Sequence, residues 1–318
     1  MARKDNPDYD IRLPEWNAED PWFDLSGDEN KTRRRALRGG RPWRVAPEDK
    51  KQPVHGKAST CDSLVNIYPN AIAVGTASGA IDEKISLIIL LVIGLIAFPV
   101  IGSFSLSPIL EYVNHHDYIV DDIYTVRSIG ALDIIMSLIF GFFSIFFLMI
   151  SIYVSKLIFL APSDLPVIFN KKTREVTFLR PIPLRFWKFW QLVKFDGVHT
   201  FRWEDVRARS YKLTEFTGSA GRESTLLVLM WPQEADPHRC EIFINIGYKG
   251  WWEDELLWRL YEHIRRYMEE DGPPIQPGET LRTSGFGKLP EFPFEVIAKA
   301  GGPALSPEEV MKLAFQAV

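Results

Sequence analysis

The sequence has almost no cysteine and none of the short motifs that mark common catalytic or metal sites. Only Cys61 and Cys240 occur among 318 residues. No Gly-x-Ser-x-Gly elbow is present, and no His-x₃-His or Cys-x₂-Cys pair has the spacing of zinc ligands. The glycine-rich stretch that ends in Gly287-Lys288 fails as a phosphate-binding loop, because Arg282 and Leu289 replace the required glycine and Ser or Thr. We therefore expect no enzyme activity, no cofactor and no metal.

The chain also lacks a charge excess, and two long segments lack charge altogether. A net charge of −4 argues against bulk binding of nucleic acid. No Asp, Glu, Lys, Arg or His occurs between Ile85 and Leu110, or between Ile134 and Ser155. At about 1.5 Å per residue, each segment can cross a hydrocarbon core of roughly 30 Å. Buried helices of a soluble protein would normally show a polar stripe, which neither segment has. We predict transmembrane helices at 83–106 and 132–160.

The distribution of Lys and Arg predicts the orientation of these helices. The connection 107–131 carries only Arg127, whereas both flanking regions are rich in Lys and Arg, and no secretory signal precedes the first helix. We expect a multi-pass protein of the bacterial inner membrane, with both termini in the cytoplasm and 107–131 outside. Both cysteines then lie in a reducing compartment, so we expect no disulfide.

The outer connection contains an unusual stretch, "EYVNHHDYIVDDIY", which begins at Glu111. It places His115 and His116 among four carboxylates, the residue types of a metal site or an acid/base centre. Adjacent histidines diverge unless the backbone bends sharply, and no metal-ligand spacing supports them. The favoured interpretation is a solvated loop. Two other interpretations are recognition of a partner on the outer face and a catalytic or metal site.

The segments before the first helix differ in character. Residues 1–60 contain an acidic block and then the basic block "KTRRRALRGGRPWR", with few aliphatic residues, which predicts a disordered cytoplasmic tail. The basic block either contacts anionic lipid or acts only as a topological signal. Residues 61–82 hold two short strand candidates around Pro69-Asn70, which we expect to join a sheet formed after the second helix.

Residues 161–272 predict an antiparallel β domain that ends in a helix. Strand candidates are "LPVIFNKKTREVTFLRP", "VHTFRWEDVRARSYKL", "STLLVLMW" and "CEIFINIG". Four-residue spacing then predicts one apolar helix face, made of Trp252, Leu256, Leu260, Ile264 and Met268. Charged pairs at i,i+4 are expected on the other side, namely Glu255–Arg259, Glu262–Arg266 and Arg266–Glu270. Several strands closed by one helix predict a pleckstrin-homology-like (PH-like) domain.

The remaining segment, 273–318, is rich in Pro and Gly and ends in a short predicted helix. Ser306 as N-cap and Glu309 three residues later form the start of a capping box. The predicted class is therefore an α+β membrane protein, with two transmembrane helices and a cytoplasmic PH-like domain closed by an amphipathic helix.

Three stretches together resemble a known family. "NIYPNAIAVGTASGAIDEK" leads into the first helix, and "VIFNKKTREVTFLR" and "FRWEDVRA" follow the second. This layout, over roughly Ser63 to Met268, is similar to uncharacterised proteobacterial two-span membrane proteins. Their genes are often found near type VI secretion and other interbacterial toxin loci. The resemblance implies an immunity or accessory role, with a cognate toxin or secretion-system protein as partner, and supplies no catalytic residues.

A second hypothesis comes from the residues themselves. The protein would be a membrane-tethered scaffold or signalling module whose PH-like domain binds a cytoplasmic protein or anionic lipid. The candidate binding residues are cations around the strands: Lys171, Lys172, Arg174, Arg207 and Arg209. The stretch "RFWKFW" at Arg185–Trp190 has the composition of nucleic-acid stacking segments, but membrane-interface or sheet packing is the favoured interpretation.

Overall fold

The chain forms two compact units. One comprises Met1–Ala80, Pro162–Pro181 and Phe195–Val318, and the other comprises Ile81–Ala161 and Ile182–Lys194. Below they are called the sheet unit and the helical unit. The computed structural model describes residues 10–14, 42–76, 81–113, 118–120, 123–125, 130–160, 162, 164–182, 186–188, 194–217, 220–251, 254–282 and 289–316.

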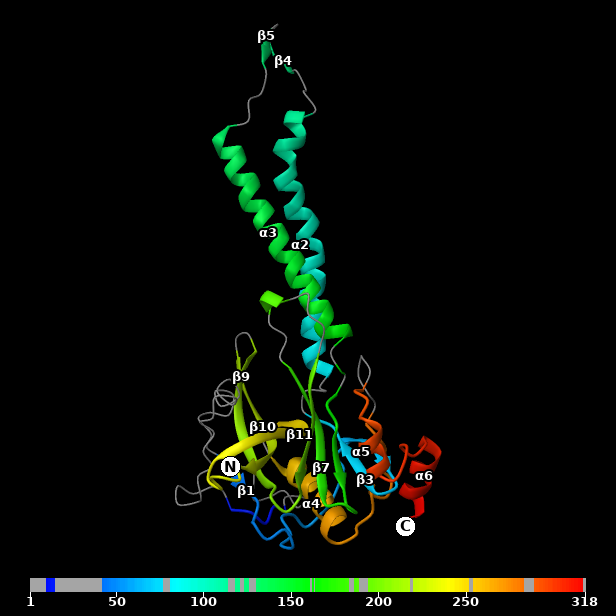
Figure 1. Ribbon diagram of the computed structural model, residues 1–318. Coiled ribbons are helices and arrows are strands. Elements are labelled where there is room, and N and C mark those ends of the chain that lie inside the picture. The colour runs from blue at the N-terminus through cyan, green and yellow to red at the C-terminus, as the bar shows by residue number, and fades with distance from the viewer. Residues whose placement is uncertain are drawn as a thin grey trace. The chain divides into compact units, whose positions relative to one another are not determined.

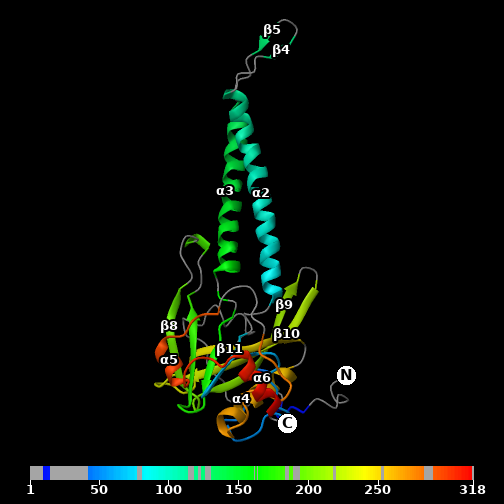
Figure 2. The same cartoon turned by 90° about the vertical axis from the view of Figure 1, so that its right-hand side faces the viewer.

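The helical unit consists mainly of two long helices that run side by side, α2 (Ile81–Val113) and α3 (Ala131–Phe159) (Figures 1 and 2). Leu87–Leu110 and Ala131–Phe159 are long and apolar enough to cross a bilayer. The two predicted apolar helices are thus confirmed, and α2 extends beyond the predicted span at both ends. Many of their large apolar side chains are exposed, for example Ile96 and Leu138 at 61% and 69%.

Small and hydroxyl residues line the contact between α2 and α3. A Cβ built on Gly102 would lie 3.0 Å from Ser144 Oγ, and one built on Gly141 would lie 3.0 Å from Ser105 Oγ. Ser105 Oγ donates a hydrogen bond of 2.8 Å to the carbonyl of Ser137. Such residues let two backbones approach closely, and their hydroxyls find partners where water is absent.

The connection between α2 and α3 contains a two-stranded antiparallel sheet, β4 (Tyr118–Val120) and β5 (Ile123–Thr125). The predicted solvated loop falls largely on residues whose side chains lie outside the described part of the chain, including both histidines and the four carboxylates. In the same unit, the 3₁₀ turn Phe186–Lys188 packs on α3, because the ring of Phe186 lies 5.6 Å from that of Tyr153.

The sheet unit contains two antiparallel sheets. The five-stranded sheet has the order β2 (Leu64–Tyr68), β3 (Ala71–Val74), β6 (Val167–Asn170), β7 (Glu175–Pro181) and β8 (Phe195–Arg202). The four-stranded sheet has the order β1 (Arg44–Val45), β9 (Arg207–Thr217), β10 (Ala220–Pro232) and β11 (Cys240–Trp251). β3 pairs with β6, from Ala71↔Asn170 to Val74↔Val167, so strands from either side of the helical hairpin are neighbours. The predicted joining of the 61–82 strand pair to the later sheet is confirmed.

The main core lies between the two sheets and helix α4 (Glu255–Glu269). Alternate residues of the strands point into it, as the two-residue period of a strand requires, with Phe178 from β7 and Leu229 from β10 as examples. Three tryptophans, Trp203, Trp231 and Trp258, are at most 1% exposed and fill its centre.

Helix α4 confirms the predicted helix and most of its predicted apolar face, since Leu260, Ile264 and Met268 are buried, while Trp252 lies outside the described residues. Leu256 is 56% exposed, whereas Leu257, Trp258, Tyr261 and Ile264 are buried. Steps of four residues advance about 40° more than one full turn, so a four-residue stripe drifts around the helix, and here it lies on the buried face from Leu260 to Met268 but not at Leu256. The pairs Glu255–Arg259 and Glu262–Arg266 form at 3.0 and 2.7 Å, while Glu270 pairs with Arg265 at 2.7 Å.

Residues 42–60 differ from the disordered tail that their composition predicts. They lie along the polar side of α4, where the Val54 amide donates to Glu262 at 3.0 Å and Arg265 Nη1 donates to the Lys50 carbonyl at 3.2 Å. Glu262 is therefore buried instead of facing solvent. Composition misses this order because the contacts are made with distant segments, through hydrogen bonds to α4 and through burial of Val54 in the main core.

Two short helices complete the sheet unit, α5 (Phe294–Lys299) and α6 (Pro307–Gln316). The capping box predicted for α6 is confirmed, since the Ser306 amide donates to Glu309 Oε2 at 2.8 Å. α5 is not predicted from the sequence. It packs on the outer face of the five-stranded sheet through contacts to a small cluster around Tyr68 and Ile168, and the Asn70 amide donates to the Ala300 carbonyl at 2.9 Å.

Candidate functional site

The predicted cationic residues lie on two segments of the sheet unit, the turn between β6 and β7 and strand β9. Lys171, Lys172 and Arg174 lie on the turn between β6 and β7. Lys171 Nζ pairs with Asp271 at 2.5 Å, and Arg174 pairs with Glu204 at 2.8 Å and with Glu269 at 2.7 Å. Lys172 is exposed. The turn is therefore held to the end of α4 by ion pairs, and most of its positive charge is neutralised within the chain.

The other two predicted cations lie on β9. Arg207 pairs with Glu48 at 2.6 Å. Arg209 is 4% exposed, and burial lowers the pKa of its guanidinium. The structure thus pairs three of the five cations with carboxylates, buries Arg209 and leaves Lys172 exposed. It does not gather them into one open cationic surface among the described residues.

Buried polar groups at the ends of the strands form a second cluster. Asp164 Oδ1 accepts hydrogen bonds from the amide of Thr76 at 2.8 Å and the amide of Leu165 at 2.7 Å. Asp164 Oδ2 pairs with Arg282 Nη1 at 2.8 Å. Thr76 precedes α2 and Asp164 follows α3. The group of Thr76, Asp164 and Arg282, called the clamp, therefore links the segment before the first long helix to the segment after the second. Its side chains are buried, so it supports structure and offers no open site.

The histidines of the sheet unit do not assemble a metal centre. No group of three or more His, Cys, Asp or Glu within the described residues is placed to hold a metal ion. His55 is fully buried, with its Nε2 2.7 Å from Glu255 Oε1. His263 is also fully buried, and Gln276 Nε2 donates to its Nδ1 at 3.0 Å. Both hold neighbouring segments in place.

The most open feature of the sheet unit is the edge strand β8. It is the last strand of the five-stranded sheet and pairs only with β7. Across the residues that the structure describes, its far side receives one bond from the protein, from Trp231 Nε1 to the Arg202 carbonyl at 3.2 Å. The opposite edge of this sheet is covered, since the amides of Arg282 and Leu305 donate to the Leu64 and Ile67 carbonyls on β2. An unpaired edge offers backbone donors and acceptors to another strand.

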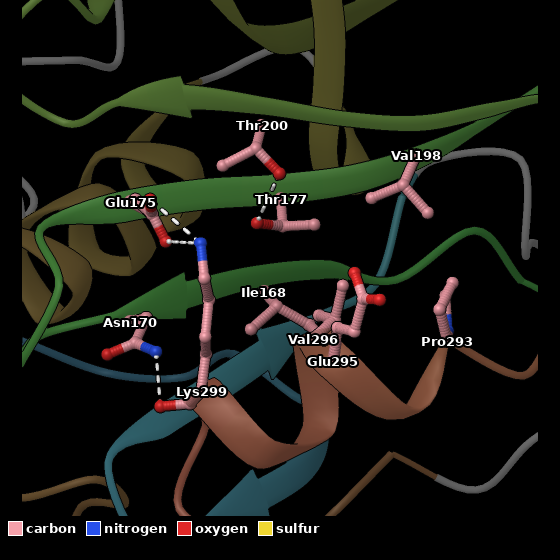
Figure 3. A pocket seen from close by; sticks show the side chains of 10 residues that line it. All are labelled: Ile168, Asn170, Glu175, Thr177, Val198, Thr200, Pro293, Glu295, Val296 and Lys299. Carbon is pink, nitrogen blue, oxygen red and sulfur yellow. Dashed lines mark hydrogen bonds and ion pairs between the residues drawn. The ribbon is translucent and has the colours of Figure 1, made fainter.

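A groove of about 230 Å³ lies on the outer face of the sheet beside β8 (Figure 3). Its floor comes from β6, β7 and β8, and its wall is α5. Thr177 and Thr200 are cross-strand partners whose hydroxyls lie 3.1 Å apart on this floor. Lys299 reaches from α5 over the sheet to Glu175 at 3.2 Å, as Figure 3 shows. Below this is called the outer groove.

A second groove, of about 720 Å³, lies on the other side of β8. It is bounded by the end of β8 and by the connection between β10 and β11, so it opens between the two sheets. Phe201 and Trp231 are stacked at its base, with ring centroids 5.1 Å apart. Its ionisable lining consists of Glu175, Asp205, Glu234, Glu241 and Arg202. Below this is called the acidic groove.

Fold and site together define an α+β protein with two long apolar helices, antiparallel sheets and, among the described residues, an edge strand β8 that lies between two grooves. A model of a family of unknown function (DUF6708) matches residues 144–297. The matched segment starts within α3 and ends within α5, and it includes β8, the lining of the acidic groove and the lining of the outer groove except Lys299. No curated protein and no solved structure matches the chain.

Sequence reasoning did not identify the edge of β8 as a candidate site. It treated "VHTFRWEDVRARSYKL" as one strand candidate, whereas the structure divides this stretch between β8 and β9, with Trp203 and Val206 buried at the turn. The alternation of Val198, Thr200 and Arg202 on a strand is visible in the sequence. Its position at an edge is not, because strand order depends on long-range pairing.

Proposed function

We propose that the protein is a non-enzymatic, two-span inner-membrane protein whose cytoplasmic PH-like domain binds another protein. The observation that carries this proposal is the unpaired edge of β8 between two grooves. Two meandering sheets followed by the amphipathic helix α4 support the PH-like assignment, and the two apolar helices support the membrane tether.

Binding to protein has more support than binding to anionic lipid. A headgroup site needs cations free to face phosphate, but Lys171, Arg174 and Arg207 each pair with a carboxylate and Arg209 is buried. The edge of β8, by contrast, presents backbone groups that only another polypeptide can pair along a strand. Of the two ligands in the scaffold hypothesis, a cytoplasmic protein and anionic lipid, we therefore propose the protein.

The biological setting that we propose is the one implied by the family resemblance, protection against or assistance of an interbacterial toxin. The test is deletion of the gene, followed by co-culture with toxin-producing siblings and with susceptible competitors. We expect lower survival or weaker killing, restored by the intact gene. Unchanged survival together with unchanged killing would contradict the toxin-linked role and leave protein binding as a separate question.

Protein binding itself can be tested in living cells with the full chain. A photo-crosslinking amino acid at Thr200 on β8 should capture a discrete partner, while the same group at the exposed Lys172 serves as the matched control. We expect a crosslinked species that depends on position 200. Absence of any protein crosslink at position 200 would contradict the proposed function.

Orientation needs its own measurement. A cysteine placed at Asn114, which lies outside the described residues, should react with a membrane-impermeant thiol reagent in intact spheroplasts. Cys61 and Cys240 should not react under these conditions, because both belong to the sheet unit that we place in the cytoplasm. Labelling of the sheet unit in place of position 114 would reverse the proposed topology.

A further inference from the structure

The surroundings of β8 restrict which polypeptide can dock there. This inference rests on the proposed function, since it names the chemistry of the partner at the same site. Along a strand, successive side chains point to opposite faces. A strand added to β8 would therefore send alternate side chains to the outer face of the sheet and into the space between the sheets.

Beside β8, the outer groove is lined by small and β-branched side chains without charge. Its floor beside β8 is made of Val198, Thr200 and Thr177, and Val296 of α5 faces the same space (Figure 3). Lys299 and Glu175 satisfy each other at one end, with 3.2 Å between Lys299 Nζ and the carboxylate. This pairing neutralises the charge at that end, and the Glu295 carboxylate on α5 is the other ionisable group of the described lining (Figure 3).

The acidic groove fits a basic side chain. Asp205, Glu234 and Glu241 are exposed, and no cation among the described residues forms an ion pair with any of them. Arg202 is the one basic residue of the lining. Three unpaired carboxylates against one guanidinium leave the groove negative, and complementary charge selects partners and speeds their encounter.

Two residues, Glu175 of β7 and Thr200 of β8, line both grooves. Thr200 is on the edge strand, so the backbone of an added strand would pass directly beside it, with one groove on either side. Gly197, at the start of this edge, has a φ of +109° and open space where a Cβ would project. That arrangement leaves the approach to the edge free of side chains at this position.

We infer that β8 binds an extended segment of a partner protein that alternates an uncharged β-branched residue with Lys or Arg. The β-branched side chains would occupy the outer groove, the basic side chains would occupy the acidic groove, and backbone hydrogen bonds to β8 would supply sequence-independent affinity. Acidic segments are excluded from the second groove by like-charge repulsion.

The test uses the full chain in detergent or nanodiscs and three fluorescent peptides. The first alternates Val and Lys, the second alternates Val and Glu, and the third is the Val/Lys peptide with alternate backbone nitrogens methylated, which removes the ladder donors. We expect the first peptide to bind, measured by anisotropy, and the other two to bind at least about tenfold more weakly. Equal binding of the Lys and Glu peptides, or full binding of the methylated peptide, would overturn the inference.

Variants of the chain sharpen the result. Glu234→Gln with Glu241→Gln should weaken the Val/Lys peptide by about tenfold, since two exposed charge contacts are lost. Glu308→Gln, an exposed carboxylate on α6, is the matched control and should leave binding unchanged. If removal of residues 31–41 raises the affinity for the peptide, the chain's own basic segment is the occupant, and the assignment to a separate partner is wrong.

Failure of this inference is distinguishable from failure of the proposed function. A position-dependent crosslink at Thr200 in cells with no peptide preference would leave protein binding in place and reject the stated partner chemistry. Loss of the crosslink itself would reject both.

Discussion

Arg282 Nη1 lies 2.8 Å from Asp164 Oδ2, and both side chains are 4% exposed. Through Asp164 this pair also holds the Thr76 amide, so it joins three segments that are far apart in the sequence. A buried ion pair is sensitive to loss of one partner, because the other charge stays buried without compensation.

We expect Asp164→Ala to destabilise the sheet unit by about 3–5 kcal/mol. The measurement is urea unfolding of the full chain in detergent, followed by tryptophan fluorescence, since the core contains three buried tryptophans. Glu48→Gln removes the exposed end of the Arg207 pair and serves as the control, with little expected change. A loss below 1 kcal/mol for Asp164→Ala would show that the clamp contributes little.

Gly75 provides an independent check on the same clamp. A Cβ at this position would lie 2.3 Å from Asp164 Oδ2 and 2.4 Å from Arg282 Nη1, so Gly75→Ala must displace the pair. We expect the costs of Gly75→Ala and Asp164→Ala to be clearly non-additive in a double-mutant cycle. Strict additivity would mean that Gly75→Ala acts elsewhere.

His263 should make stability depend on pH. Burial lowers its pKa from 6.5 to about 4, so the neutral ring is favoured in the folded state. Between these values the unfolded chain binds more protons, and stability must fall as the pH is lowered from about 6.5 toward 4. The full effect is roughly 3 kcal/mol at 1.36 kcal/mol per pKa unit.

His263→Gln should remove this part of the pH dependence. The comparison is the difference in unfolding free energy between pH 7 and pH 4.5 for the variant and the parent chain. Carboxylates with lowered pKa values, such as Glu255 and Glu262, also reduce stability when they are protonated at low pH. This loss is the same in the variant and in the parent chain, so it cancels in the comparison. His238→Gln, at an exposed histidine, is the control and should behave like the parent. An unchanged pH profile for His263→Gln would contradict the prediction.

The contact between α2 and α3 predicts a specific crosslink. A Cβ on Gly102 would lie 3.9 Å from Ser144 Cβ, within the usual Cβ–Cβ range of disulfides. Gly102→Cys with Ser144→Cys should therefore oxidise readily in a background of Cys61→Ser and Cys240→Ala. Gly102→Cys with Phe142→Cys is the control, because Phe142 is 66% exposed on another side of α3. Equal crosslinking of the two pairs would argue against this interface.

Cys240 should resist thiol reagents while the chain is folded. It is 1% exposed, and burial raises the pKa of its thiol to about 12. In a Cys61→Ser variant at pH 8, we expect maleimide labelling only after denaturant is added. The reciprocal Cys240→Ser variant retains the partly exposed Cys61 and should label in the folded state. Rapid labelling of folded Cys240 would mean that the outer face of the four-stranded sheet opens readily.

Local sequence patterns predict which helices and strands form better than they predict which of these elements contact one another. The hairpin around Asn170–Glu175, the two apolar helices and the capping box at Ser306 follow from neighbouring residues, and the structure contains all three. The polar face of α4 and the order of residues 42–60 depend on each other across the chain, as in the bond from Val54 to Glu262. Neither can be derived from one segment alone.

The candidate site shows the same limit. Lys171, Arg174 and Arg207 are candidate binding residues because they are basic and lie near strands. Whether they are free to bind a ligand depends on carboxylates from other segments, with which they form ion pairs: Asp271, Glu204, Glu269 and Glu48. The edge of β8 becomes a candidate only when strand order is known. Charge in a sequence indicates what a residue can bind, whereas topology decides what it already binds.

The pairing of β3 with β6 has a consequence for how the chain is made. Val74 leaves the ribosome before the helical hairpin, and its partner Val167 leaves after it. At 5–20 residues per second, β3 waits roughly 5 to 20 seconds for β6. Throughout that interval its apolar side chains have no sheet to join. In the proposed two-span topology, the sheet can close only when both ends of the hairpin emerge on the same side, so a chain in which one of the two helices fails to cross leaves β3 without β6.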